Sequence, residues 1–461
     1  MNDAGHAISR NPATHAEIAR YPFASHSEIE TILSRAQAAF LAWRDTTPDD
    51  RAACLDRMAG LLRDERDSLA RTITLEMGKT LAEARAEVEK CADHAAWYAK
   101  HGPAWLADEP APVAGNAARV SYLPTGVILG IMPWNFPLWQ ALRAAVPILL
   151  GGNGFLLKPA PNVVGSALAM RDIADRAGLP GSLFAVLNCA NDPIERIVHD
   201  RRIAGVTLTG SPRAGAAVAA MAGSALKPSV LELGGSDPFI VLADADIEAA
   251  VAAGITGRYG NAGQVCIAAK RFLLEAPIAD AFLERFIAAA RALRVGDPLD
   301  AATRMGPMAR ADLRDELHGQ VGRTLSEGAV LALGGHPIDG PGNFYPPTVL
   351  TGVEPGMTAF EAETFGPVAA FTVARDAEQA VALANTSEYG LSASLWTADR
   401  DRARRLARRI ETGGVFVNGV SASDPRVPIG GVKRSGYGRE LSHFGLRAFV
   451  NVQTVWDRTA L

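Results

Sequence analysis

The strongest constraint on the fold is a regular alternation of short apolar runs and helical segments between residue 126 and about residue 230. The apolar runs have the composition of buried strands and lie at 126–131, 154–157, 183–187 and 206–208. Helical segments separate them near 138–149, 166–177, 193–199 and 212–222. Alternation of this kind predicts an α/β fold with a parallel sheet covered by helices on both faces. A second series runs from Glu232 to about Gly414, and 448–456 predicts one more strand.

The first hundred residues predict helices. Ser27 and Glu30 have the spacing of a capping box, and apolar residues follow at helical intervals. Thr47 and Pro48 predict the start of a second helix, because proline is tolerated at the first helical position. A third amphipathic pattern covers 68–101.

Composition and charge exclude several classes of protein. The chain has 461 residues, which predicts two or three domains. It has 46 basic and 50 acidic residues, a net charge of −4, and no basic tract, which argues against a nucleic-acid binder. The start lacks a basic or apolar export signal, which predicts a cytoplasmic protein. No CxxC pairing occurs, so we expect neither a metal site nor disulfides among Cys54, Cys91, Cys189 and Cys266.

An uncharged stretch at 120–142 is long enough to cross a bilayer, since it spans 23 residues. Pro124, Pro133 and Pro137 interrupt it, and Asn135 would be stranded in lipid. We therefore expect a buried strand, a loop and the start of a helix, and no membrane partner.

Cys266 follows a glycine-rich turn at 260–266, where backbone amides can point at its sulfur. Positive potential of this kind favours the thiolate that a reactive cysteine needs. The alternative is a buried structural cysteine, which we favour for the other three. For Cys266 the turn and the spacing leave both interpretations open.

Two further motifs lie at predicted strand ends. Glu232 ends an apolar run before two glycines, where it is either a general base with a raised pKa or a strand-end acceptor of backbone N–H groups. The turn at 209–215 follows a strand and opens a helix, as phosphate-binding turns do, but it is not a GxGxxG motif. Neither motif assigns a function alone.

Together, eight motifs occur in the order and spacing of the aldehyde dehydrogenase superfamily, which the whole chain resembles. They are WNFP at 134–137, LKPAP at 157–161, TGS at 209–211, LELGG at 231–235, GQVC at 263–266, ETFGP at 363–367, GVFVN at 414–418 and PIGGVKRSG at 428–436. The resemblance implies a Rossmann-type cofactor domain, an α/β catalytic domain and a β oligomerisation arm.

The resemblance implies three catalytic residues. Cys266 is the expected nucleophile, which forms a thiohemiacetal and then a thioester. Asn135 is expected to hold the oxyanion together with the backbone N–H of Cys266. Glu232 is expected to activate the water that releases a free acid, which argues against the coenzyme A-acylating branch.

The cofactor implied by the resemblance is NAD, with NADP as the alternative. Pro161 stands where many NAD-preferring relatives carry a glutamate that repels a 2′-phosphate, so the choice between the two stays open. The expected cofactor contacts are Trp134, Lys158, Pro161, Gly210, Ser211, Leu233, Glu363 and Phe365.

The substrate prediction depends on Arg143 and Ser423, which resemble positions of a bacterial succinate-semialdehyde dehydrogenase subgroup. Arg143 is expected to pair with the far carboxylate of the substrate, with Ser423 adding a hydroxyl. The alternative for Arg143 is a surface helix arginine. Gly260 replaces an arginine used by some relatives, which weakens the substrate assignment. Ala144 replaces a lysine often found in the family, so a proton relay through that lysine must be absent or replaced.

We therefore expect residues 1–107 and 126–230 to form the dinucleotide-binding domain and 231–425 the catalytic domain. Residues 108–125, with a hairpin turn at Gly115-Asn116, and 440–461 are expected to form the arm. Exposed strand edges there predict a homodimer or homotetramer. The predicted activity is oxidation of succinate semialdehyde to succinate. The rivals are a dehydrogenase of another aldehyde, an esterase-like hydrolase and a non-catalytic binding protein.

Overall fold

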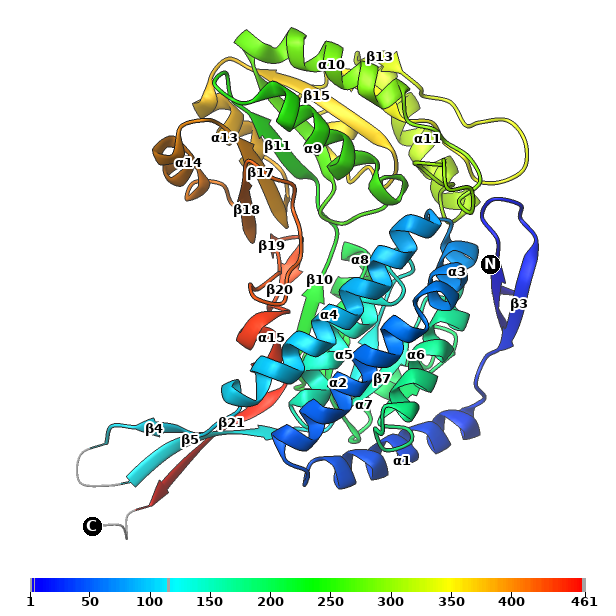
Figure 1. Ribbon diagram of the computed structural model, residues 1–461, viewed down its shortest axis with the longest axis vertical. Helices are drawn as coiled ribbons and strands as arrows, with labels where there is room; N and C mark the ends of the chain where they lie inside the picture. Colours follow the sequence, from blue (N-terminus) through cyan, green and yellow to red (C-terminus); the bar gives the residue numbers. More distant parts are fainter. Residues whose placement is uncertain (1, 4, 114–116, 458–461) are drawn as a thin grey trace.

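The computed structural model describes residues 2–3, 5–113 and 117–457, which form two α/β bodies and a projecting arm (Figure 1). The first body contains a six-stranded sheet in the order β20-β10-β9-β6-β7-β8. Five strands are parallel and β20 is antiparallel, which confirms the predicted parallel sheet. Its strands are β6 (Val127–Ile131), β7 (Gly154–Lys158), β8 (Phe184–Val186), β9 (Ile203–Thr209), β10 (Ser229–Glu232) and β20 (Gly436–Tyr437).

The predicted helices between these strands are present. They are α5 (Trp139–Leu150), α6 (Val164–Arg176), α7 (Ile194–His199) and α8 (Pro212–Ser224). Every residue of α5 is buried, because the helix packs against α2 and α4 as well as beside β6 and β7. The uncharged 120–142 stretch is thus strand, loop and buried helix, and none of the described helices is long and apolar enough to cross a membrane.

The N-terminal segment differs from the helical prediction. It begins with a three-stranded antiparallel sheet of β1 (Asn2–Asp3), β2 (His6–Arg10) and β3 (Glu17–Pro22). The turn after β2 reaches the second body, where the N–H of Asn343 donates to the carbonyl of Pro12 at 2.8 Å. Helical periodicity therefore begins only at α1.

Four helices follow: α1 (His26–Trp43), α2 (Pro48–Asp64), α3 (Arg66–Met77) and α4 (Leu81–Trp105). Thr47 caps α2 with Pro48 at its start, as predicted. The capping box of α1 uses Ser25 and Glu28 instead of the predicted pair two residues later. The predicted helix over 68–101 is two helices, because Gly78 ends α3 with φ of 88°.

The second body contains a seven-stranded sheet in the order β13-β14-β15-β12-β11-β17-β18, parallel except for β13. Its strands are β11 (Asp237–Val241), β12 (Ala269–Glu275), β13 (Val330–Leu333), β14 (Thr348–Thr351), β15 (Val368–Ala374), β17 (Ser392–Trp396) and β18 (Gly414–Val417). The longer helices of this body are α9 (Ile247–Tyr259), α10 (Ala279–Arg291), α11 (Ala311–Ser326), α13 (Ala377–Asn385) and α14 (Arg400–Ala407).

The remaining elements are short. They are the 3₁₀ helices η1 (Gly260–Gly263) and η2 (Ala276–Ile278), α12 (Thr358–Glu361), β16 (Tyr389–Gly390), β19 (Val432–Lys433) and α15 (Ser442–Arg447). The chain returns to the first sheet at β20, where Gly436 pairs with Glu232. The sequence after the second sheet therefore helps to build the first body.

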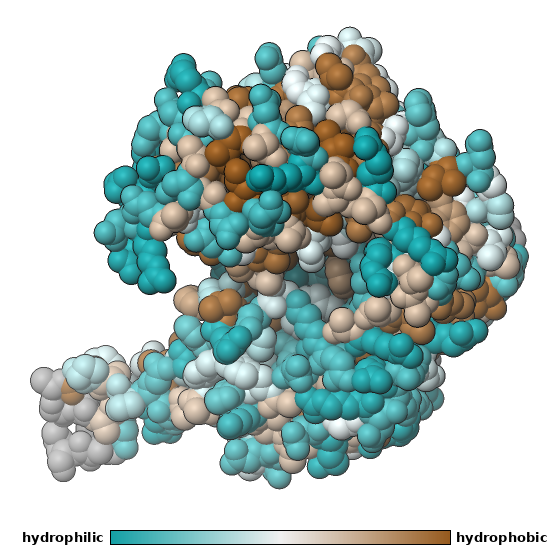
Figure 2. Space-filling view, turned by 45° about the horizontal axis from the view of Figure 1, so that its top comes forward, coloured by the Kyte–Doolittle hydropathy of each residue, from teal (hydrophilic) through white to brown (hydrophobic). Residues whose placement is uncertain are grey.

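The arm consists of β4 (Glu109–Ala111), β5 (Ala117–Pro124) and β21 (Val450–Asp457) in one antiparallel sheet. It projects clear of both bodies (Figures 1 and 2). The predicted turn at Gly115-Asn116 lies outside the described residues. Residues 440–449, which we expected in the arm, pack in the body instead, because Glu440 pairs with Ile429 and α15 contacts α4 and α5.

Candidate active site

Strand ends bring the predicted site residues together. In the first sheet Ile131 is opposite both Lys158 and Leu208, and Thr209 is opposite Glu232. The loops that follow β6, β7, β9 and β10 therefore leave the sheet at the same edge, the carboxyl edge at which open α/β sheets bind ligands. Cys266 precedes β12 in the second sheet, and both sheets contribute walls to one cavity of about 710 Å³.

A left-handed turn presents Cys266 to this cavity. Asn261, Ala262 and Gly263 have φ of 53°, 51° and 71°. A Cβ atom at Gly263 would lie 2.3 Å from the carbonyl oxygen of Gly366, so the position requires glycine. The buried Arg258 fastens the turn, since its Nη2 donates to the carbonyls of Gly263 at 2.7 Å and Gly366 at 2.6 Å.

The electrostatics of Cys266 differ from the sequence prediction. Burial raises the pKa of the thiol to about 11, although the nearby cations Arg143 and Lys270 oppose the rise. The expected positive potential is present, but desolvation outweighs it. The sulfur is therefore a thiol at neutral pH, and its reaction requires a base.

Asn135 lies beside Cys266 in the cavity wall, as predicted. Its Nδ2 donates to the carbonyl of Gln264 at 2.9 Å, and Nδ2 of Asn261 donates to the carbonyl of Asn135 at 2.8 Å. A side-chain amide has two N–H groups, so one is left for a ligand. Among the described residues, no hydrogen bond uses the backbone N–H of Cys266. Two donors are thus available near the sulfur.

The loop that carries Asn135 is fastened from α4. Glu87 accepts the N–H groups of Leu138 and Trp139, both at 2.9 Å, and so caps the start of α5. Its other oxygen pairs with the buried Lys79 at 2.6 Å. The sequence analysis did not identify this pair, because nothing local links α4 to the Asn135 loop.

Glu232 is 2% exposed, and its Oε1 has no hydrogen-bond partner among the described residues. Burial raises its pKa to about 7, and the nearby Arg143 limits the rise. Nη2 of Arg143 lies 3.8 Å from Oε2 of Glu232. A carboxyl group in this state exchanges protons near neutral pH, as a general base must.

The structure gives Arg143 neighbours that the sequence analysis did not predict. Its Nε donates to Glu440, its Nη2 donates to Thr209 Oγ1 at 3.3 Å, and the residue is 1% exposed. Its burial excludes the surface arginine of the alternative interpretation, and its pairing with the substrate carboxylate stays a prediction. It lies between Glu232 and Glu440. This position bears on the proton relay, because the lysine that serves as a relay in relatives is Ala144 here.

Ser423 also has a different neighbour from the one expected. Its Oγ accepts a hydrogen bond from Nζ of Lys90 at 2.7 Å, whereas Arg143 donates to Glu440 and Thr209. Lys90 lies on α4 with its ammonium 4.2 Å from the ring centroid of Trp139. Sequence reasoning missed Lys90, because helical spacing alone assigns it to a solvated face.

Most of the expected cofactor residues line the cavity, whereas Lys158 and Pro161 are absent from its walls. The lining members of the set are Trp134, Gly210, Ser211, Leu233, Glu363 and Phe365. Two glycines shape this wall. A Cβ at Gly215 would lie 2.5 Å from Leu233, and one at Gly234 would lie 2.1 Å from the Glu363 carboxylate.

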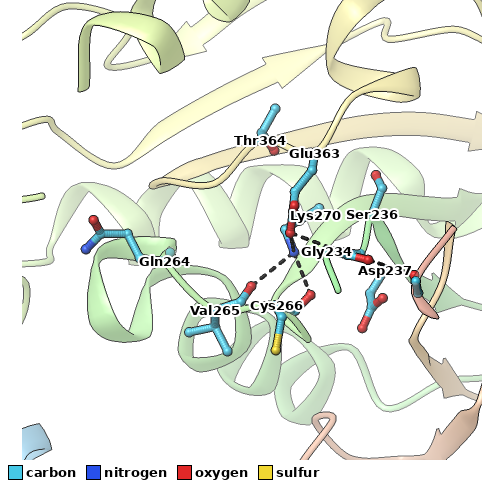
Figure 3. A network of polar contacts seen from close by, with 12 residues as sticks. Gly234, Ser236, Asp237, Gln264, Val265, Cys266, Lys270, Glu363 and Thr364 are labelled. Atoms are coloured by element: carbon cyan, nitrogen blue, oxygen red, sulfur yellow. Dashed lines mark hydrogen bonds and ion pairs between the residues drawn. The ribbon is translucent and has the colours of Figure 1, made fainter. Parts of the chain in front are cut away.

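Lys270 connects Glu363 to the cysteine turn (Figure 3). Its ammonium lies 3.1 Å from Oε1 of Glu363 and donates to the carbonyls of Val265 at 3.0 Å and Cys266 at 2.7 Å. The same carboxylate oxygen accepts the N–H of Gly235 at 3.1 Å. Sequence analysis missed Lys270, although a lysine inside the apolar run that becomes β12 was a usable signal.

Two α/β sheets that meet over a reactive cysteine, with an amide and a carboxyl group beside it, are the arrangement of enzymes that oxidise aldehydes through a covalent intermediate. The chain belongs to the aldehyde dehydrogenase family, whose model matches residues 2–455. It is therefore an oxidoreductase. No group of side chains suited to a metal ion occurs in the described part of the chain.

Several similar proteins within this family are named as succinate semialdehyde dehydrogenases. The chain is 57% identical over 456 residues to the succinate semialdehyde dehydrogenase [NAD(P)+] Sad of Escherichia coli, with 99% of both chains covered. It is 48% identical to a succinate-semialdehyde dehydrogenase [NADP(+)] of Mycolicibacterium paratuberculosis, covering 97% and 95%. The crystal structure of the Streptococcus pyogenes succinic semialdehyde dehydrogenase with NADP+ superposes with a TM-score of 0.95 at 35% identity, covering 98% and 99%.

Proposed function

We propose that the protein oxidises succinate semialdehyde to succinate with NAD or NADP. The chemistry rests on Cys266 and Asn135 in the wall of one cavity, and on a buried Glu232 whose pKa is near 7 and whose charge acts on Cys266. The 57% identity to a succinate semialdehyde dehydrogenase over nearly the whole length supports the substrate. Localisation in the cytoplasm stays a prediction of the sequence.

The cavity residues fit a dinucleotide. Gly210 and Ser211 precede α8, whose N-terminal N–H groups favour a phosphate, and Arg213 adds a positive charge to the same wall. Trp134 and Phe365 form an edge-to-face pair with ring centroids 5.9 Å apart, which suits a flat ring. Glu363 supplies a carboxylate for ribose hydroxyls. The nicotinamide, when bound, supplies the hydride acceptor.

The chain's own residues account for the remaining steps. The Cys266 thiol gives up its proton to solvent, and the sulfur forms a bond to the aldehyde carbon. The free N–H of Asn135 and the backbone N–H of Cys266 stabilise the resulting oxyanion. Once the carbon is at the level of a thioester, Glu232 takes a proton from water, which attacks the carbonyl carbon. The bond between the sulfur and the carbonyl carbon then breaks, succinate leaves, and the sulfur takes the proton that Glu232 received from water, which restores the thiol.

Arg143 favours the action of Glu232 as a base for two reasons. Arg143 holds positive charge beside Glu232 and stays ionised at every relevant pH, so it stabilises the carboxylate form without giving up a proton itself. Glu440 fixes Arg143 from the other side. We infer that this buried set replaces the lysine relay of relatives.

Steady-state rates for a panel of aldehydes with each cofactor test the proposal. We expect succinate semialdehyde to have the highest kcat/KM, and Cys266→Ala to abolish oxidation with either cofactor while dinucleotide binding is kept. A preference for uncharged aldehydes would assign the protein to another member of the family. Activity that survives Cys266→Ala would overturn the covalent mechanism.

We also infer that the arm joins two copies of the chain. β21 has exposed side chains along its length, including Val452 at 59% and Trp456 at 46%. An apolar edge strand of this kind is unfavourable in a monomer. A second copy is the simplest partner, because homo-oligomers with closed symmetry are the common case.

A further inference from the structure

The first turns of α4 carry two glutamates, Glu83 and Glu87, which are four residues apart and therefore lie on one face of the helix. Glu87 holds the loop of Asn135 by accepting two backbone N–H groups at the start of α5. Glu83 has a different target. Its Oε1 accepts the N–H of Asn261 at 2.7 Å, in the left-handed turn before Cys266. One helix face thus holds both sides of the nucleophile's surroundings.

The carboxylate of Glu83 is itself fixed in place. Its Oε2 accepts the N–H of Thr80 at 3.0 Å and the hydroxyl of Thr80 at 2.8 Å, which are contacts of the capping box of α4. The two oxygens therefore have separate tasks, since Oε2 caps the helix and Oε1 holds the turn. This end of α4 also contacts the second body, where the N–H of Leu81 donates to the carbonyl of Pro298 at 2.9 Å (Figure 1).

Asn261 connects this contact to the two expected oxyanion donors. Its Nδ2 donates to the carbonyl of Asn135 at 2.8 Å and to the carbonyl of Gln264 at 3.3 Å. The side chain of Asn135 donates to the same Gln264 carbonyl at 2.9 Å. Gln264 precedes Cys266 by two residues. A continuous set of hydrogen bonds therefore runs from Glu83 through Asn261 to the segments that carry both donors.

The N–H of Asn261 depends on a strong acceptor. Asn261 has φ of 53°, which a residue other than glycine rarely adopts, and it is 3% exposed, so a lost partner would leave a buried donor unsatisfied. A hydrogen bond to a carboxylate is roughly twice as strong as one to a neutral acceptor. Arg258 fastens the end of this turn within the second body. Glu83 fastens its start to the first body.

We propose that Glu83 is a positioning residue for the covalent chemistry. It holds the turn of Cys266 against the loop of Asn135, so that the backbone N–H of Cys266 and the amide of Asn135 point at one oxygen atom of the substrate. This role is additional to its role as a helix cap. The inference rests on the proposed function, because it requires Cys266 to be the nucleophile.

The test compares Glu83→Ala and Thr80→Ala with the unchanged protein. Both variants break the capping box, but only Glu83→Ala removes the acceptor of the Asn261 N–H. We expect kcat for succinate semialdehyde to fall about tenfold to a hundredfold in Glu83→Ala, because misplaced oxyanion donors stabilise the transition state poorly. In Thr80→Ala the fall should stay below about twofold. The KM for the dinucleotide should change by less than about twofold in both, since neither residue lines the 710 Å³ cavity.

A conservative variant and thermal unfolding separate positioning from stability. Glu83→Gln keeps an oxygen that can accept the N–H of Asn261, so it should retain most of the kcat that Glu83→Ala loses. Glu83→Ala and Thr80→Ala should lower the melting temperature by similar amounts, because both lose the cap. A kcat that falls equally in these two variants would show that Glu83 is only a cap and would overturn the proposal.

A double-mutant cycle with Asn135→Ala locates the effect of Glu83. If Glu83 acts by aligning the two oxyanion donors, Glu83→Ala should cost less than about threefold in kcat once the amide of Asn135 is absent. The same large loss with and without that amide would mean that Glu83 acts elsewhere, and the proposal would be wrong.

The outcomes also separate this inference from the proposed function. If Cys266→Ala still oxidises aldehydes, the proposed mechanism fails and the role of Glu83 fails with it. If Cys266 is essential and Glu83→Ala keeps the kcat of the unchanged protein, the assignment of Glu83 alone is wrong.

Discussion

At the scale of single residues, we expect Glu232 to set the pH dependence of kcat. The carboxylate is the form that accepts a proton, and its pKa is about 7. Below that pH the active form falls roughly tenfold per unit, so kcat should rise from pH 5 to 7 and level off above. A pH profile of kcat for succinate semialdehyde measures this. A profile that stays flat between pH 5 and 7 would contradict the assignment.

Glu232→Gln provides the matching control. The variant should lose the pH step and accumulate an acyl group on Cys266, because glutamine cannot take a proton from the deacylating water. Rapid quenching followed by mass spectrometry detects the adduct on the peptide that contains Cys266. A collapse of turnover without an adduct or a burst would show that Glu232 acts before the thioester forms or only structurally.

Arg143 controls the same titration from a neighbouring position. Arg143→Met removes the cation that lowers the pKa of Glu232 and leaves Glu440 to raise it, while Arg439 still opposes the rise. The pH step in kcat should therefore move upward, and activity at pH 7 should fall to a similar extent for succinate semialdehyde and butanal. Arg143→Lys keeps a cation at this position and should return the pH step most of the way to its original position. Selective loss of the charged aldehyde would return Arg143 to substrate binding.

At the scale of elements, the turn before Cys266 carries the largest conformational demand. Gly263→Ala combines φ of 71° with a Cβ atom 2.3 Å from the carbonyl of Gly366 and 2.5 Å from Arg258. Strain of this kind costs about 1–3 kcal/mol, so the melting temperature should fall and Cys266 should lose its position and activity.

A second glycine provides the control for this turn. Gly60 is exposed in α2, and a Cβ there meets nothing within 4 Å. Gly60→Ala should stabilise the protein by about 0.5–1 kcal/mol, because alanine is the better helix former. Differential scanning calorimetry of both variants should give a lower melting temperature for Gly263→Ala and a higher one for Gly60→Ala. Activity is measured in parallel. Equal effects would mean that the turn is not constrained as described.

At the scale of the whole molecule, the arm is the place to test the proposed assembly. Val452→Lys places a charge on the exposed side of β21 and should reduce the mass in solution, measured by light scattering, from a multiple of the chain mass. Val373→Lys is the matched control, since Val373 is also 59% exposed but lies in β15 of the second body. A monomeric unchanged protein would overturn the assembly proposal.

The sequence by itself determined the parts of the protein that depend on local pattern. Alternating apolar runs predicted the parallel sheet, and Thr47 with Pro48 predicted the start of α2, because strands and caps depend on neighbouring residues. The motifs at strand ends also named several of the residues that line the cavity, among them Asn135, Gly210 and Cys266. Parallel strands bring their carboxyl ends to one edge, so that gathering follows from strand order.

Only the tertiary structure decided which charges meet. Arg143 and Glu440 are 297 residues apart, and Lys90 and Ser423 are 333 apart, so no local pattern links either pair. The pKa of Cys266 likewise depends on burial by segments distant in the sequence, which outweighs the favourable turn. The sequence shows which residues can carry a charge, but the packing of distant segments determines their partners and how far they are desolvated.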